Sequence, residues 1–208
     1  MAAKILSNSD CSGDWATYYE NTEQRPPRAT LIRALDSFER EGRPENARAA
    51  DLGCGSGRDT IEILRRGWAV HAVDSSKDAI DGLTARPDLP NNAEVHTQLA
   101  RYEDMVLPGC DLINASFSLP LCPPHAFPGV WRKVCDSLRT GGRFSGQLYG
   151  DRDSWAVGEG MTFHTAKEVD TLLAGFKVEF LFEEEEDSVT PRGTPKHWHI
   201  FHVVAKKP

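Results

Sequence analysis

The chain has 208 residues, of which 26% are charged and 39% hydrophobic, and its formal net charge is −7 with a sequence pI of about 5.5. This length is typical of one domain with a sizeable core. The acidic balance disfavours a protein that binds the phosphate backbone of nucleic acids, because such proteins need a basic face. No apolar run reaches the ~18 residues needed to span a membrane.

The cysteines and the N-terminus predict the compartment. The five cysteines are scattered, odd in number, and contain no C-x-x-C pair, which is typical of reduced thiols rather than of a disulfide framework. The first residues lack a basic region followed by an apolar block, so we expect no signal peptide. Together these features predict a cytoplasmic protein.

Residues 1–28 are polar and irregular, and Trp15, Tyr18 and Tyr19 lie close together within them. This cluster is either a hydrophobic flap that packs for stability or a lid that crosses a binding site. From position 29 onward, apolar residues recur at i, i+3, i+4 and i+7, which is the spacing of one helix face. Gly42 is a plausible end of that helix.

Strand and helix patterns alternate along the rest of the chain, which predicts one domain over residues 1–208 with a flap at 1–28. Alternation implies parallel strands with helices on both faces of the sheet. The last two strands are joined by a loop, so one of them must run antiparallel. The expected strands are 47–52, 68–74, 93–98, 110–115, 144–149, 177–183 and 197–206, and the expected helices are 29–42, 58–66, 76–85, 127–138 (closed by Gly141 and Gly142) and 165–173.

The most informative stretch is 49–59, Ala-Ala-Asp-Leu-Gly-Cys-Gly-Ser-Gly-Arg-Asp, where a short apolar strand runs into alternating glycines and then a helix. Glycine lets a ligand approach the main chain, and backbone amides next to a helix N-terminus suit an anionic or polar ligand. The next predicted strand ends in Asp74, whose carboxylate can accept hydrogen bonds from ribose hydroxyls. This combination predicts a nucleoside-binding unit.

The glycine spacing separates two classes of cofactor. Dinucleotide enzymes need G-x-G-x-x-G, whereas this chain has G-x-G-x-G with Asp51 two residues before the first glycine. The Asp-Leu-Gly-Cys-Gly-Ser-Gly stretch resembles motif I of the class I S-adenosylmethionine-dependent methyltransferases. A nicotinamide-dependent oxidoreductase is therefore disfavoured. A non-catalytic S-adenosylmethionine-binding protein, acting as a sensor or partner subunit, stays open as the alternative.

This resemblance implies a Rossmann-like three-layer α/β sandwich whose seven-stranded sheet has the order 3-2-1-4-5-7-6 with strand 7 antiparallel. It also implies an enzyme that moves a methyl group from S-adenosyl-L-methionine to N, O or S of a small molecule, similar to the tellurite-resistance and thiopurine methyltransferase groups. The N/D-P-P-Y/F motif of nucleic-acid base methylases is replaced here by Asn-Ala-Ser-Phe after the fourth strand. We expect a small-molecule acceptor, no nucleic-acid or membrane partner, and a monomer or homodimer.

The resemblance also assigns roles to individual residues. The first motif holds the methionine part of the cofactor, Asp74 binds the ribose, the turn at Arg101 flanks the adenine, and the segment after the fourth strand lies under the sulfonium. Arg25 either pairs with the cofactor carboxylate or is a surface charge. The expected cofactor-binding residues are Tyr19, Arg25, Asp51, Gly53, Gly55, Asp74, Ser75, Arg101, Tyr102, Asn114, Ala115 and Ser116.

Methyl transfer depends mainly on alignment and desolvation, with a base where the nucleophile arrives protonated. The expected candidates are His197, His164 and Tyr149. A mostly apolar indole favours a helix layer for Trp198, which would turn His197 and His199 towards the acceptor; the alternative is that both histidines are structural.

Two further features concern charge and metals. The acidic run 183–187 is expected at the rim of the site, where it would favour a neutral or cationic acceptor over an oxyanion. The histidines late in the chain have no helical ligand spacing and no supporting cysteine pair, so no metal site is predicted.

Overall fold

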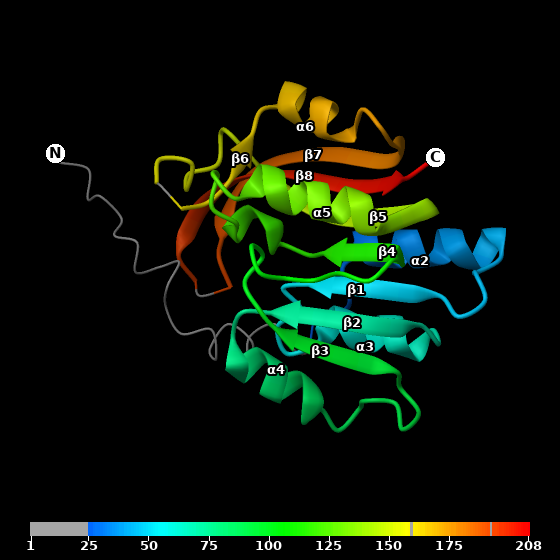
Figure 1. Cartoon of the computed structure of the whole chain (residues 1–208). Helices are drawn as coiled ribbons and strands as arrows, with labels where there is room; N and C mark the ends of the chain where they lie inside the picture. Colours follow the sequence, from blue (N-terminus) through cyan, green and yellow to red (C-terminus); the bar gives the residue numbers. More distant parts are fainter. Residues whose placement is uncertain (1–24, 159, 192) are drawn as a thin grey trace, which may run out of the picture.

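The computed structural model describes residues 25–158, 160–191 and 193–208. One mixed sheet runs through the molecule in the order β3-β2-β1-β4-β5-β8-β7, and a short extra strand, β6, pairs with β5 (Figure 1). The strands are β1 (Arg48–Leu52), β2 (Ala69–Asp74), β3 (Val95–Leu99), β4 (Cys110–Ala115), β5 (Leu138–Gly150), β6 (Phe163–His164), β7 (Lys177–Val189) and β8 (Pro195–Lys206). The helices are α2 (Ala29–Glu41), α3 (Arg58–Arg65), α4 (Lys77–Thr84), the 3-10 turn η2 (Leu119–Leu121), α5 (Phe127–Ser137) and α6 (Ala166–Leu173).

The strand directions confirm the predicted fold. All neighbouring pairs are parallel except those of β8, which runs antiparallel to both β5 and β7. The expected order 3-2-1-4-5-7-6 is the observed order once the sixth and seventh expected strands are read as β7 and β8. Only the two-residue strand β6 was not expected.

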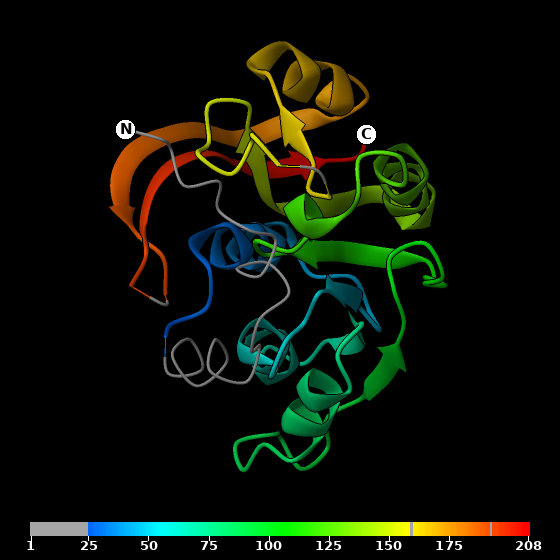
Figure 2. The same cartoon turned by 90° about the vertical axis from the view of Figure 1, so that its left-hand side faces the viewer.

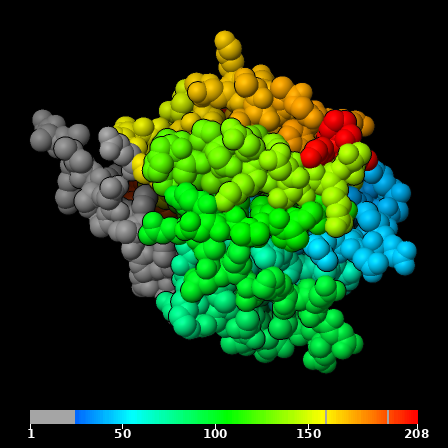
Figure 3. Space-filling model, in the orientation of Figure 1, coloured from blue at the N-terminus to red at the C-terminus, as the bar shows by residue number. Residues whose placement is uncertain are grey.

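Helices cover both faces of the sheet, as the alternation of elements predicts (Figures 1 and 2). On one face, α5 and α6 contribute Trp131, Val134, Val169 and other buried side chains to a core with β1, β4 and β5. On the other face, α2 packs over β5 and β8, α3 over β1 and β2, and α4 over β2 and β3, and the three helices share a second core that contains Leu35. Side chains of α5 and α6 close over their face in the space-filling view (Figure 3). Within residues 25–158, 160–191 and 193–208, no helix is long and apolar enough to cross a membrane.

Several local predictions are confirmed. The helix at α4 begins after Ser76, whose hydroxyl accepts the Ala79 amide. The helix at α6 begins with a capping box, in which Thr165 accepts the Glu168 amide and the Glu168 carboxylate accepts the Thr165 amide. Each cap satisfies amides that the first helical turn leaves unpaired.

The expected end of α5 at Gly141 and Gly142 is wrong. The helix ends at Ser137, and β5 begins at once with Leu138, which pairs with Cys110 of β4. A register shift follows, and a Cβ at Gly142 would come within 2.9 Å of the Asp111 carbonyl oxygen. The glycine pair therefore allows close backbone approach at an irregularity inside a strand instead of ending a helix.

The strands β7 and β8 are both longer than expected, and they pair along their whole length from Lys177↔Lys206 to Val189↔Pro195. The acidic run 183–187 lies inside β7 and not in a loop at its end. Four of its five carboxylates bond to histidines of β8 across the strand pair, and such cross-strand pairs stabilise a sheet.

Candidate functional site

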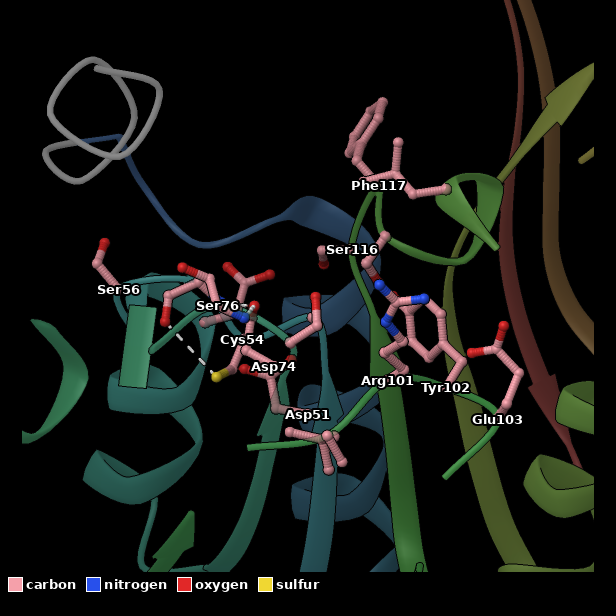
Figure 4. A pocket seen from close by; sticks show the side chains of 18 of the residues that line it. Asp51, Cys54, Ser56, Asp74, Ser76, Arg101, Tyr102, Glu103, Ser116 and Phe117 are labelled. Atoms are coloured by element: carbon pink, nitrogen blue, oxygen red, sulfur yellow. Dashed lines mark hydrogen bonds between the residues drawn. The ribbon is translucent and has the colours of Figure 1, made fainter. Parts of the chain in front are cut away.

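A cavity of about 410 Å³ opens at the carboxyl ends of β1 to β4, where ligands bind in open α/β sheets. Its walls are the glycine turn after β1 and the segments that follow β2, β3 and β4, with one further contribution from residues 160–161 (Figure 4). The lining residues are Asp51, Gly53, Cys54, Gly55, Ser56, Arg58, Asp59, Val73, Asp74, Ser75, Ser76, Ala100, Arg101, Tyr102, Glu103, Ser116, Phe117, Ser118, Leu121, Pro123, Gly160 and Met161.

The turn that follows β1 requires glycine at its first position. Gly53 has φ +66°, and a Cβ there would lie 2.4 Å from Cβ of Ser118 and 3.0 Å from the Tyr102 hydroxyl. Its amide donates to the Val73 carbonyl oxygen at 2.8 Å, which holds the turn against β2. Glycine is therefore needed here because Ser118 and Tyr102 fill the space that a side chain would take.

Asp74 connects this turn to the next helix. One carboxylate oxygen accepts the Gly55 amide at 2.9 Å, and the other accepts the Ser76 amide at 2.9 Å. Burial raises the pKa of Asp74, although both amides lower it. Each carboxylate oxygen has a second lone pair, so the group can also accept hydrogen bonds from hydroxyls of a ligand.

Below the turn lies a buried polar network. Asp51 accepts the Thr60 hydroxyl at 2.5 Å and the Asn114 side-chain amide at 2.9 Å. Burial, followed by the charge of Asp59, raises the pKa of Asp51 to about 7. Burial would also raise the pKa of Asp59, but the guanidinium of Arg58, 2.8 Å away, outweighs it and lowers that pKa. The network therefore favours a single negative charge at Asp59, next to a cation that lines the cavity.

Most of the predicted cofactor residues meet in this cavity. Asn114 and Ala115 do not line it: Asn114 is buried behind Asp51 and bonded to Ser145 at 2.9 Å, and Ala115 belongs to the core. Arg25 is exposed and is not among the lining residues, and Tyr19 lies outside the described residues. The predicted residues that line the cavity are Asp51, Gly53, Gly55, Asp74, Ser75, Arg101, Tyr102 and Ser116.

Sequence reasoning missed part of the lining. Arg58 directly follows the glycine motif, and its position at the start of α3 was a readable signal. Glu103 follows the Arg101–Tyr102 turn directly and also lines the cavity. Gly160 and Met161 come from an irregular segment that has no helix or strand periodicity in the sequence. The lining residues without a predicted role are Arg58, Asp59, Val73, Ser76, Ala100, Glu103, Leu121, Pro123, Gly160 and Met161.

One side of the cavity continues into an aromatic cluster. Phe117, Leu121 and Met161 line the cavity and also belong to this cluster. Its other members are Tyr149, Trp155, Phe163, Trp198 and Ile200.

Trp198 lies in that cluster, with its ring 6.0 Å from Tyr149 and 5.8 Å from Trp155. The expectation that Trp198 faces a helix layer is therefore wrong. The segment 151–158 folds over this face of β8 and supplies Trp155. The ammonium of Lys196 lies 4.1 Å above the Trp155 ring and 4.3 Å above the Trp198 ring, paired with Asp153.

His197 and His199 lie on the opposite face of β8 from Trp198. His197 bonds to Asp187 at 2.8 Å and to Glu185 at 3.1 Å, while His199 bonds to Glu183 at 2.9 Å. Neither lines the cavity, and no residue of 183–187 does, so the expectation of histidines and an acidic rim at the acceptor side is wrong. These histidines and the carboxylates of 183–187 form hydrogen bonds with one another instead.

The other two candidate catalytic residues are buried beside the cavity and do not line it. Tyr149 lies in the aromatic cluster, 6.3 Å from the ring of Phe117. The ring of His164 packs against that of Phe127, with 4.7 Å between their centroids. Burial lowers the pKa of His164, and its Nε2 has no hydrogen-bond partner among the described residues. In that same part of the chain, no group of three His, Cys, Asp or Glu side chains is placed to hold a metal ion.

A glycine turn with an acid before it and an acid after the next strand, on a sheet of this order, defines a class I methyltransferase fold. Comparison with known proteins agrees: residues 49–142 match the family described as "Methyltransferase domain". Residues 49–142 are thus similar in sequence to a methyltransferase domain.

Two curated proteins are similar over part of the chain. One is the probable cobalt-precorrin-6B C(15)-methyltransferase (decarboxylating) of Methanococcus vannielii, 52% identical over 48 residues, which are 22% of this chain and 27% of that protein. The other is the ubiquinone biosynthesis O-methyltransferase of Caulobacter sp., 29% identical over 119 residues, which are 54% of this chain and 47% of that protein. The chain therefore matches less than half the length of either relative.

Two solved structures share the fold. TehB from Haemophilus influenzae superposes with a TM-score of 0.74 at 14% identity, over 92% of this chain and 66% of TehB. Magnesium protoporphyrin IX methyltransferase from Synechocystis PCC 6803, with bound SAM, superposes with a TM-score of 0.64 at 11% identity, over 97% of this chain and 99% of that one.

Proposed function

We propose that this protein is a methyltransferase that uses S-adenosyl-L-methionine to methylate N, O or S of a small molecule. The observation that carries the proposal is the cavity itself, in which a bare glycine turn, a ribose-type acid and a cation converge. The Synechocystis enzyme of the same fold has S-adenosylmethionine bound.

The residues present fit this cofactor. Gly53 leaves no room for a Cβ, so the glycine turn packs closely against Ser118 and Tyr102 where all three residues line the cavity. Asp74 would accept the ribose hydroxyls, and Ser75 with the 101–103 turn would flank the adenine. Arg58, at the start of α3, would pair with the methionine carboxylate, in place of the predicted Arg25. When bound, S-adenosylmethionine supplies an electrophilic methyl group on a positively charged sulfur.

The acceptor would approach from the side of Phe117 and Met161, opposite the adenosine-binding segments. His197, His164 and Tyr149 stay predictions as catalytic groups, and their positions outside the lining favour a mechanism of alignment and desolvation. A nucleophile that is already deprotonated or neutral needs no base in such a site.

The remaining expectations concern partners and compartment. We propose a cytoplasmic protein, since Cys54, Cys110, Cys122 and Cys135 are all free. A net charge of −7 gives little attraction to nucleic acid or to an anionic membrane surface. A monomer or homodimer, with no nucleic-acid or membrane partner, stays a prediction.

Isothermal titration of the protein with S-adenosylmethionine and with NAD tests the cofactor. Micromolar binding of the first and none of the second is expected, and the reverse would overturn the proposal. Release of S-adenosylhomocysteine is then measured with a panel of thiols, phenols and amines. Binding without any turnover would favour the alternative, a non-catalytic sensor or partner subunit.

A further inference from the structure

We infer that the acceptor end of the cavity takes a neutral molecule with a flat apolar ring, and that Phe117 is the residue that selects it. This inference rests on the proposed function, because the cofactor defines which end of the cavity receives the acceptor. It names the acceptor class, which the methyltransferase fold leaves open.

The backbone of Phe117 is the first observation. Its φ is +55°, in the left-handed region that a bulky residue normally avoids. Its amide donates to the side-chain oxygen of Gln147 at 3.1 Å, and the Gln147 amide group donates to the Thr30 hydroxyl at 2.9 Å. Gln147 is buried, so this network fixes the turn. Strained residues held by their surroundings gather at ligand sites, where the direction of the side chain matters.

The ring of Phe117 is also held in place. The Arg28 guanidinium lies over it, 4.2 Å from its centroid, and the rings of Tyr149 and His202 approach its edge at 6.3 and 6.2 Å. Phe117 is still only half-buried and lines the cavity, where Figure 4 shows it at the upper rim above Ser116. A fixed aromatic surface of this kind favours offset stacking or edge contact with another ring.

The neighbouring lining residues carry no charge. Phe117 shares its cluster with Leu121 and Met161, and Pro123 lies two positions beyond Leu121. The charged lining groups come from other segments, namely the ends of β1, β2 and β3 and the start of α3. A charged acceptor would lose its hydration among Leu121, Pro123 and Met161. This desolvation disfavours an oxyanion, and it disfavours an ammonium further because the Arg28 guanidinium lies over Phe117.

The test uses the protein saturated with S-adenosylhomocysteine. Binding of thiophenol, cyclohexanethiol and selenite is measured by calorimetry in mildly acidic buffer, where thiophenol keeps its proton and both thiols are neutral. The two thiols are then similar in size and charge and differ in flatness. Thiophenol is expected to bind at least ten-fold more tightly than cyclohexanethiol, and selenite is expected not to bind. Failure of thiophenol to bind, or equal affinity for both thiols, would overturn the inference while leaving the proposed function intact. Failure of S-adenosylhomocysteine itself to bind would instead overturn the proposed function.

Two variants assign the effect to Phe117. Asparagine tolerates a left-handed backbone, so Phe117→Asn should fold, keep S-adenosylhomocysteine affinity within two-fold and lose thiophenol affinity by at least ten-fold. Phe117→Leu keeps apolar volume without a flat ring and should lose part of that affinity. The matched control is Phe182→Asn on β7, where the phenyl group is 51% exposed and does not line the cavity. Wild-type thiophenol affinity in both Phe117 variants would show that Phe117 does not select the acceptor.

Discussion

The carboxylate of Asp74 accepts the amide of Gly55 at 2.9 Å, which ties the end of β2 to the glycine turn after β1. The same carboxylate accepts the Ser76 amide at the start of α4. Asp74 therefore shapes the cavity as well as facing it. Its side chain therefore has a structural role that the sequence pattern alone did not reveal.

Asp74→Ala should weaken S-adenosylmethionine binding by at least ~10-fold, because hydrogen bonds to a charged acceptor are worth ~1.5–3 kcal/mol and ~1.4 kcal/mol is a factor of ten. Calorimetric titration of the folded variant measures this. Asp81→Ala, which removes an exposed acid of α4, is the matched control and should leave affinity unchanged. Wild-type affinity in Asp74→Ala would refute the ribose assignment.

Gly53→Ala should both destabilise the protein and reduce cofactor affinity. The new methyl group would lie 2.4 Å from the Ser118 Cβ, and φ +66° is unfavourable for alanine; strain of this kind costs about 1–3 kcal/mol. Urea denaturation and calorimetry give the two effects. Gly129→Ala in α5, where a Cβ meets nothing within 4 Å, should instead stabilise by about 0.4–1 kcal/mol. If Gly53→Ala changed neither stability nor cofactor affinity, the turn would be shown to relax easily around the new methyl group.

The sequence predicted what depends on local pattern. Strand and helix alternation predicted parallel strands with helices on both faces, and the resemblance to class I methyltransferases implied the sheet order. The motif around Gly53, together with Asp74, predicted the polar side of the cavity. These features follow from chain connectivity, since parallel strands bring their carboxyl ends to one edge.

The acceptor side was not predictable in the same way. The face of Trp198 depends on the segment 151–158, whose Asp153 pairs with Lys196 beneath Trp155. An indole can pack equally well against a helix or against such a segment, and no periodicity distinguishes the two. The left-handed turn at Phe117 likewise depends on Gln147, thirty positions away.

The buried pair of Lys196 and Asp153 should be essential to this side of the molecule. Both side chains are fully buried, and Asp153 also accepts the amides of Trp155 and His199. Asp153→Ala should cost about 3–5 kcal/mol of unfolding free energy, because it leaves a buried ammonium uncompensated. Urea denaturation measures the loss.

The double variant Asp153→Leu with Lys196→Met provides the control for that experiment. It removes both charges, and replacement of a buried pair by apolar groups is often neutral. It should therefore recover most of the stability that Asp153→Ala loses. A double variant as unstable as the single one would show that the amide contacts of Asp153, and not its charge, dominate.

The last prediction concerns pH and the buried ring of His164. Burial against Phe127 lowers its pKa, so the folded state favours the neutral ring more than the unfolded chain does. The folded protein then binds fewer protons, and stability should fall as the pH drops below the unfolded histidine pKa of about 6.5. His164→Leu should reduce this loss of stability between pH 7.5 and 5.5, measured as the shift in urea midpoint.

His197 should affect the pH dependence of stability in the opposite direction, because Asp187 and then Glu185 raise its pKa. The stabilisation that protonated His197 provides is present below pH ~6.5 and is lost as the pH rises through its folded pKa. His197→Gln should therefore weaken the fall in stability at higher pH and leave the fall at lower pH, which belongs to His164, in place. The same pH slope in His164→Leu as in the wild type would assign the acid sensitivity to another group.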